Sequence, residues 1–143
     1  MEYTVVYDTY VEVPIRISKT TPDEARIKRL ERWPKEAGLS QPLGEGGTFM
    51  DLVKSFARDY ELEVGEKNWS NSTTEGKIII KMEQKLLRNG TQRGAAKMEG
   101  EISLTPTEEG GNLVYTAKLK YSIELDNDVL AEKAASDVVE FNL

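Results

Sequence analysis

The chain has 143 residues, of which 38% are hydrophobic and 31% charged, and its formal net charge is -6 at pH 7. This length is typical of one globular domain, which buries roughly two thirds of the surface that its unfolded chain exposes. The absence of cysteine and histidine excludes disulfides, thiolate metal sites and general-base chemistry by histidine. The acidic net charge argues against nucleic-acid binding, which requires lysine and arginine to neutralise phosphates.

The sequence shows no targeting or membrane segment. No run approaches the roughly 18 apolar residues of a membrane span, and the N-terminus lacks the basic segment and apolar stretch of a signal peptide. We therefore expect a cytoplasmic protein without integral membrane association. No acidic segment has the spacing of a metal-binding loop, so we assign no metal and no cofactor. Because no linker or repeat divides the chain, residues 1–143 are expected to form one domain.

The first predicted elements are a strand and a helix. Residues 1–17 alternate with period two, which predicts a long strand, and we expect it to bend near Pro14, which cannot donate to a ladder. Its apolar face carries Tyr3, Val5, Tyr7, Val11, Val13, Ile15 and Ile17. Residues 20–33 are predicted to form a helix in which Pro22 takes the first helical position, and Pro34 and Gly38 are expected to end it.

A second short helix and a loop follow. Between residues 47 and 64, apolar residues recur at helical spacing at Phe49, Leu52, Val53, Phe56 and Ala57. The segment 65–75 is polar and is expected to be a loop that exposes one aromatic residue, Trp69.

Three strands, 76–88, 92–104 and 112–125, predict an antiparallel meander, because cross-strand partners must share a face. A two-residue turn at Asn89-Gly90 would set Ile80 opposite Glu99, whereas a bulge between Asn89 and Thr91 pairs Met82 with Met98. The predicted pairs are Ile78 with Ile102, Ile80 with Gly100, Met82 with Met98 and Gln84 with Ala96. In the next hairpin we expect Ile102 opposite Tyr115, Gly100 opposite Ala117 and Met98 opposite Leu119.

The chain ends in a predicted amphipathic helix. Asp126 or Asn127 can cap it, and its apolar stripe is Leu130, Ala134, Val138 and Phe141. We expect this stripe to face the sheet.

Residues 93–141 resemble the last strands and helix of the SRPBCC or START-like superfamily, whose members include relatives of a carbon monoxide dehydrogenase component and of the birch-pollen allergens. The sequence LERWPKEA resembles the tryptophan-proline that often follows the first helix in that group. The resemblance implies an α+β helix-grip fold: a curved antiparallel sheet wrapped around a C-terminal helix, with two short helices after the first strand. It also implies a cavity for an apolar ligand between sheet and helix.

Small residues on the inner face are compatible with such a cavity, but close packing of the helix is the more usual arrangement. They are Gly94, Ala96, Gly100 and Ala117 on the strands and Ala131, Ala134 and Ala135 on the helix. The candidate ligand-binding residues line this space from the first strand, the meander and both flanking helices. They are Tyr3, Tyr7, Trp33, Met82, Gln84, Met98, Tyr115, Ala117, Leu119, Tyr121, Leu130, Ala134 and Val138.

Each candidate also has a structural interpretation. The tyrosine hydroxyls could reach the sheet rim and water, Trp33 could plug the core, and Met82 and Met98 could fill it. Gln84 is the best polar contact for a ligand, yet a buried glutamine bonded to the helix is equally plausible.

We therefore expect a binding module for a small apolar or amphipathic, lipid-like ligand. The first alternative is an interaction module with a filled core that presents a basic face to an acidic partner chain or a second copy. The basic residues are Arg26, Lys28, Arg29, Arg32 and Lys35 on the first helix and Lys77, Lys81, Lys85, Arg88, Arg93 and Lys97 on the hairpin. The second alternative is a cyclase-like or dehydratase-like enzyme, for which no catalytic residue can be assigned.

Overall fold

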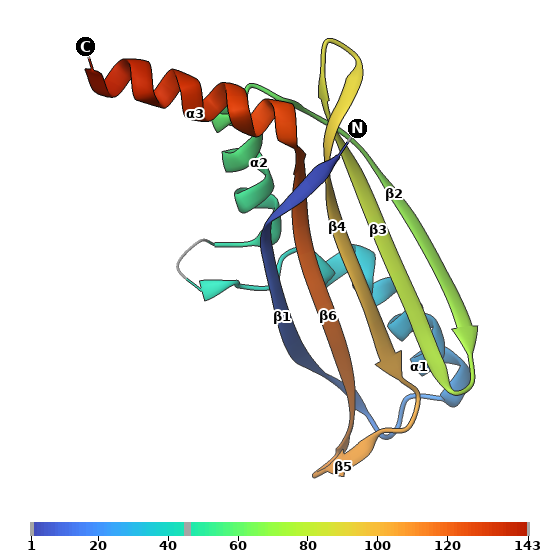
Figure 1. Ribbon diagram of the computed structural model, residues 1–143. Coiled ribbons are helices and arrows are strands. Elements are labelled where there is room, and N and C mark those ends of the chain that lie inside the picture. The colour runs from blue at the N-terminus through green and yellow to red at the C-terminus, as the bar shows by residue number, and fades with distance from the viewer. Residues whose placement is uncertain (1, 45–46, 143) are drawn as a thin grey trace.

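The computed structural model describes residues 2–44 and 47–142 and has an α+β fold (Figure 1). A curved antiparallel sheet has the strand order β1-β6-β4-β3-β2, and the short β5 also pairs with β6. The strands are β1 Tyr3–Ser18, β2 Glu63–Thr74, β3 Lys77–Arg88, β4 Thr91–Ser103, β5 Thr107–Glu109 and β6 Asn112–Asp126. The helices are α1 Asp23–Trp33, the π-helical turn η1 Pro34–Gly38, α2 Phe49–Asp59 and α3 Asn127–Asn142. The predicted fold class, with two short helices after the first strand, is confirmed.

The segment that was predicted to be a polar loop forms the edge strand β2. Trp69 lies opposite Met82, and Lys67 lies opposite Gln84. The prediction was wrong for two physical reasons. An edge strand needs partners on one side only and tolerates polar side chains, and an irregularity between Val64 and Lys67 interrupts the alternation of side chains.

The β3–β4 hairpin has the predicted register, with Met82 opposite Met98 and Gln84 opposite Ala96. The bulge, however, lies elsewhere. Asn89 and Gly90 have φ angles of 51° and 79° and form a tight two-residue turn. The extra residue is Arg93, because Leu86 pairs with Gly94 while Leu87 pairs with Gln92.

The β4–β6 pairing keeps the predicted face but not the predicted partners. Ile102 lies opposite Ala117 rather than Tyr115, and Gly100 lies opposite Leu119 rather than Ala117. The cause is β5, which forms within the predicted turn and pairs with residues 112–114, so this part of β6 is not available to the end of β4. Since the displacement is an even number of residues, side chains stay on their predicted faces.

The irregularity in β1 lies between Val5 and Tyr7 and not at Pro14. Pro14 continues the strand opposite Thr116, which an outermost strand allows because its other edge needs no donor. The irregularity reverses the faces before it: Tyr7 pairs with Ile123, whereas Tyr3 pairs with Asp126. The prediction that Tyr3 shares a face with Tyr7 was therefore wrong.

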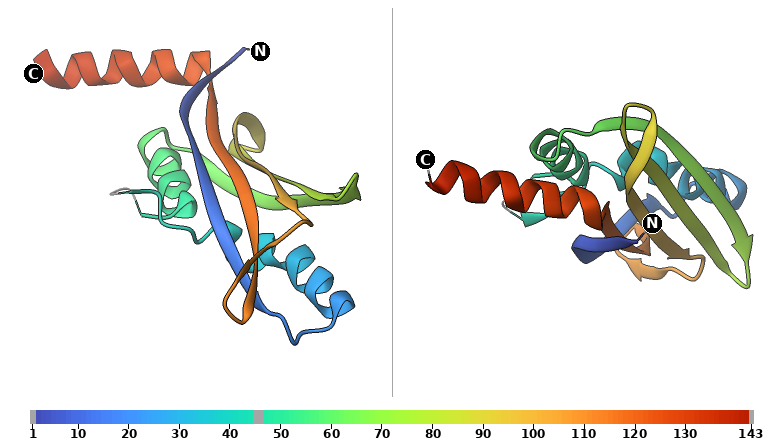
Figure 2. Two further views of the ribbon diagram at one scale, coloured as in Figure 1. Left: turned by 90° about the horizontal axis from the view of Figure 1, so that it is seen from below. Right: turned by 45° about the horizontal axis from the view of Figure 1, so that its top comes forward.

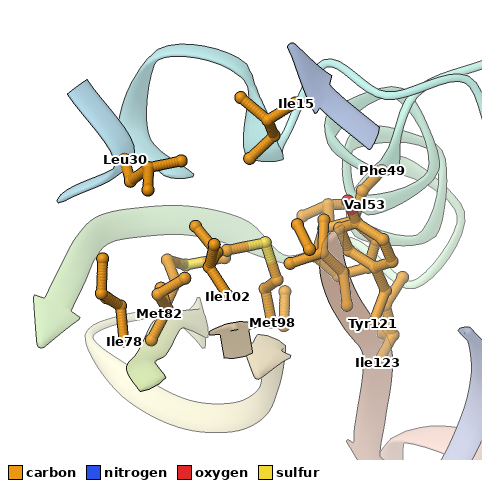
Figure 3. Packing of buried hydrophobic residues seen from close by; sticks show 14 of the residues in the cluster. Ile15, Leu30, Phe49, Val53, Ile78, Met82, Met98, Ile102, Tyr121 and Ile123 are labelled. Atoms are coloured by element: carbon orange, nitrogen blue, oxygen red, sulfur yellow. The ribbon is translucent and has the colours of Figure 1, made fainter. Parts of the chain in front are cut away.

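The hydrophobic core lies between the sheet and the helices α1, η1 and α2, and we call the covered side the inner face. Leu30 from α1 and Phe49 and Val53 from α2 are completely buried there. Figure 3 shows Phe49 and Val53 beside Tyr121 and Ile123 of β6. The helix α2 begins with a capping box in which Thr48 and Asp51 satisfy each other's backbone N–H groups.

The helix α3 extends away from the sheet instead of lying against the inner face (Figures 1 and 2). Val129 is buried and Leu130 half-buried, but Ala134 is exposed and Val138 is 59% exposed. The side chain of Phe141 lies outside the described residues. The predicted orientation of this helix was wrong, because α1, η1 and α2 already cover the inner face.

A polar contact fixes the start of α3. The Asp126 carboxylate accepts a hydrogen bond from the Asp128 backbone N–H at 2.8 Å and one from Arg93 Nε at 2.9 Å. Asp126 is 1% exposed. The hydrogen bond from Asp128, followed by that from Arg93, lowers the pKa of this carboxyl group. The bulge at Arg93 thus brings its guanidinium to the last residue of β6.

Replacing Asp126 with asparagine is expected to lower the thermal midpoint at pH 7. Because the folded-state pKa lies below the unfolded value of about 3.9, the stabilisation exists above that value and is lost as the pH falls through the folded-state pKa. Thermal melts of both proteins should therefore converge in acid. The control is Asp137→Asn in the exposed pair with Lys133. A difference between Asp126→Asn and wild type that persists or grows once the pH is below the folded-state pKa of Asp126 would contradict the assignment.

Candidate functional site

Three of the four candidate tyrosine hydroxyls are bound to other parts of the protein. The hydroxyl of Tyr115 accepts a hydrogen bond from Arg26 Nε at 3.1 Å. That of Tyr121 donates to the Gly38 carbonyl, and that of Tyr3 donates to the Gln92 carbonyl at 3.4 Å. Burial raises the pKa of Tyr121 to about 12, so it remains a donor. The contacts of Tyr121 and Tyr3 use hydroxyl donors, and that of Tyr115 uses a hydroxyl acceptor, that a ligand in the predicted cavity would need.

Two of the small residues of the inner face, Gly94 and Gly100, are covered by leucines of β6. A Cβ added at Gly100 would lie 2.6 Å from Leu119 Cδ2, and one added at Gly94 would lie 2.8 Å from Leu125 Cδ2. Ala96, Ala117 and Leu119 are completely buried. The arrangement favours close packing over a hollow at this row.

Replacing Ala117 with leucine is expected to lower the free energy of unfolding by about 1–3 kcal/mol, because added atoms would overpack a filled site. Ala117 lies between Val13 of β1 and Ile102 of β4. Denaturant unfolding measures the change, and Ala131→Leu on the exposed side of α3 is the control. An Ala117→Leu protein as stable as wild type would reveal empty volume instead.

The remaining aromatic and sulfur candidates belong to the core. Met82 and Met98 are buried opposite each other, and Met98 Sδ would lie 3.4 Å from a Cβ added at Gly38 of η1. Trp33 is half-buried and packs against the same cluster.

Gln84 is the buried amide of the inner face. Its Nε2 donates to the Gly65 carbonyl at 2.7 Å, so it binds the neighbouring strand rather than a helix. Its Oε1 is buried and has no hydrogen-bond partner among the described residues. Gln84 is 4% exposed.

A groove of about 520 Å³ opens between η1, α2 and β2, and we call it the η1–α2 groove. Its apolar wall comes from one residue of β2 and from residues next to η1 and in α2: Trp69, Leu39 and Met50. Three cations line the same groove: Lys35 of η1, Lys54 of α2 and Lys67 of β2. The same groove contains the carboxylates of Glu36 and Asp51.

Both carboxylates of the groove have partners in the protein. Asp51 Oδ2 accepts hydrogen bonds from the Thr48 backbone N–H at 3.0 Å and from Thr48 Oγ1 at 3.1 Å. The backbone hydrogen bond, followed by the hydroxyl, lowers the pKa of Asp51, and the charge of Lys54 adds a smaller effect. Glu36 Oε1 lies 3.7 Å from Arg32 Nε. None of the three lysines forms an ion pair within the described part of the chain.

The sequence did not predict this groove, although the sequence analysis named two of its residues. It singled out Trp69 as an exposed aromatic residue and counted Lys35 in the basic helix, but it missed Lys54 and Lys67. The pairing of Trp69 with Met82 would have indicated that Trp69 lies on the inner face. This pairing can be predicted only if β2 is recognised as a strand.

The two basic clusters are largely ion-paired. On α1, Arg26 contacts Asp23, Lys28 lies 3.8 Å from Glu24, and Arg32 pairs with Glu36. On the hairpin the pairs are Lys77 with Glu101, Arg88 with Glu132, Arg93 with Asp126 and Lys97 with Glu124. These faces are therefore less available to an acidic partner than the sequence suggested.

The acidic side chains do not gather into a metal site: no cluster of three or more that is suited to a metal ion occurs within residues 2–44 and 47–142. None of the helices in these ranges combines the length and apolar character needed to cross a membrane.

Comparisons with known proteins give little further guidance. No family model matches the chain, and no curated protein matches its sequence. A solved structure of an uncharacterized protein from Rhizobium leguminosarum is 13% identical, with alignment over 85% of this chain and 82% of that chain. The TM-score of this alignment is 0.31, which is too low to indicate a shared fold.

Proposed function

We propose that this protein is a binding module for a small amphipathic molecule, and that its ligand occupies the η1–α2 groove. The observation that carries the proposal is an apolar wall of Trp69, Leu39 and Met50 in a space of about 520 Å³. Small-molecule sites are typically concave, apolar and about 300–1,000 Å³ in volume. The resemblance to the SRPBCC or START-like superfamily supports ligand binding, and we propose membership of that superfamily with a different placement of the site.

The η1–α2 groove differs from the site that the sequence predicted, which lay between the sheet and the C-terminal helix. That space was expected to be lined by Leu130, Ala134 and Val138, but Ala134 and Val138 are exposed on α3. In the η1–α2 groove, by contrast, Trp69 is only half-buried, so part of the indole remains accessible. Indole and thioether surfaces suit apolar ligands, because an indole offers a large apolar face and a thioether adapts to irregular shapes.

Titration with the neutral fluorescent probe N-phenyl-1-naphthylamine tests the proposed function. Wild type should bind the probe saturably at one site, and Trp69→Ala should weaken binding by about tenfold, equivalent to about 1.4 kcal/mol. The matched control is Tyr10→Ala, since Tyr10 is 56% exposed on the opposite face of the sheet. Absence of saturable binding by wild type, or equal binding by Trp69→Ala, would refute the proposal.

A further inference from the structure

We infer that the ligand of the η1–α2 groove is a monoanionic amphiphile whose charged group is held by Lys35, Lys54 and Lys67. This inference rests on the proposed function and adds the chemical class of the ligand. The three lysines come from η1, α2 and β2 and line the same groove as Trp69. An apolar tail against Trp69 would therefore place its head group within reach of all three elements.

The carboxylates of the groove leave the lysines available to an anion from solution. Asp51 is bound to Thr48 through the capping box at the start of α2, where the helix dipole also stabilises a carboxylate. Glu36 is the partner of Arg32, one helical turn earlier. The three lysines are exposed and carry no ion pair among the described residues.

The charge balance of the groove favours one negative charge on the ligand. The side chains that line the groove are three lysines and two carboxylates, and Arg32, the partner of Glu36, is not among them, so the lining itself carries one net positive charge. A carboxylate or sulfonate amphiphile neutralises that charge. A phosphate monoester, with about -1.5 to -2 charges at pH 7, would exceed it.

Displacement of N-phenyl-1-naphthylamine by three ten-carbon competitors tests the inference. Wild type should bind decanoate about tenfold more tightly than decanol at low salt. The reason is that the carboxylate contacts three exposed lysines, and each of these contacts contributes modestly to binding. Decyl phosphate should bind no more tightly than decanoate. The preference for decanoate should shrink as the Debye length falls from about 10 Å at 0.1 M salt to about 3 Å at 1 M.

Two triple variants locate the effect. Lys35→Gln/Lys54→Gln/Lys67→Gln should bind decanoate and decanol equally, with decanol binding unchanged. The control Lys81→Gln/Lys118→Gln/Lys120→Gln removes the same charge from exposed positions on the opposite face of the sheet and should keep the preference.

The outcomes separate this inference from the proposed function. Equal binding of decanoate and decanol by wild type would overturn the inference and leave the proposed function standing. An equal loss in the control variant would also overturn it, since net charge alone would then explain the preference. Tighter binding of decyl phosphate than of decanoate would overturn the monoanion assignment. If neither probe nor competitors bind wild type, both proposals fail.

Discussion

Replacing Phe49 with alanine is expected to lower the free energy of unfolding by about 3–5 kcal/mol. Phe49 is completely buried at the first turn of α2, and its ring centroid lies 4.9 Å from that of Tyr121. Removing the ring leaves a cavity between α2 and β6 that rigid neighbours cannot fill. Denaturant unfolding followed by circular dichroism measures the loss.

The control for Phe49→Ala is Val139→Ala on α3, where the side chain is 60% exposed. This change should alter stability by no more than about 0.5 kcal/mol. The pair of variants distinguishes the two candidate core helices. A large loss from Val139→Ala together with a small loss from Phe49→Ala would show that α3, not α2, covers the inner face.

Replacing Gln84 with glutamate is expected to destabilise the protein by several kcal/mol at pH 7, the usual penalty for a buried unpaired charge. The introduced carboxylate would replace the amide that donates to the Gly65 carbonyl and would face that oxygen at about 2.7 Å. It would also keep the buried oxygen that already has no partner among the described residues. The loss is measured as the difference in unfolding free energy.

The pH dependence of Gln84→Glu follows from burial. Desolvation raises the folded-state pKa of a buried carboxyl above its unfolded value of about 4.3. The destabilisation is therefore smallest below pH ~4.3 and grows as the pH rises towards the folded-state pKa. The control Gln84→Met removes both polar atoms at similar length and should cost much less, because no buried charge is created. A pH-independent loss in Gln84→Glu would contradict this account of the site.

Much of the candidate site could not be predicted from the sequence, because the groove is formed by three segments that are separate in the chain. The helical spacing that predicts α2 does not show that Lys54 will lie near Lys67. That proximity depends on β2 being a strand and on α2 crossing the inner face. Only the aromatic character of Trp69 was visible beforehand, and its partner Met82 became evident from the observed register.

Local sequence patterns were sufficient to predict most of the strands and helices, the pairing of β3 with β4 and the amphipathic helix α2. These features depend on side-chain period and on neighbours close in the chain, and a wrong face for Met82 or Met98 would expose core residues. The choice of the helix that covers the inner face, in contrast, depends on long-range packing. The segment α2 offers Phe49, Val53 and Ala57 for burial, whereas the exposed part of α3 offers mainly alanines and two valines. The stabilisation from burial grows with the apolar area that is removed from water. The helix α2, which has the larger apolar side chains, therefore covers the inner face, and α3 extends away from the sheet.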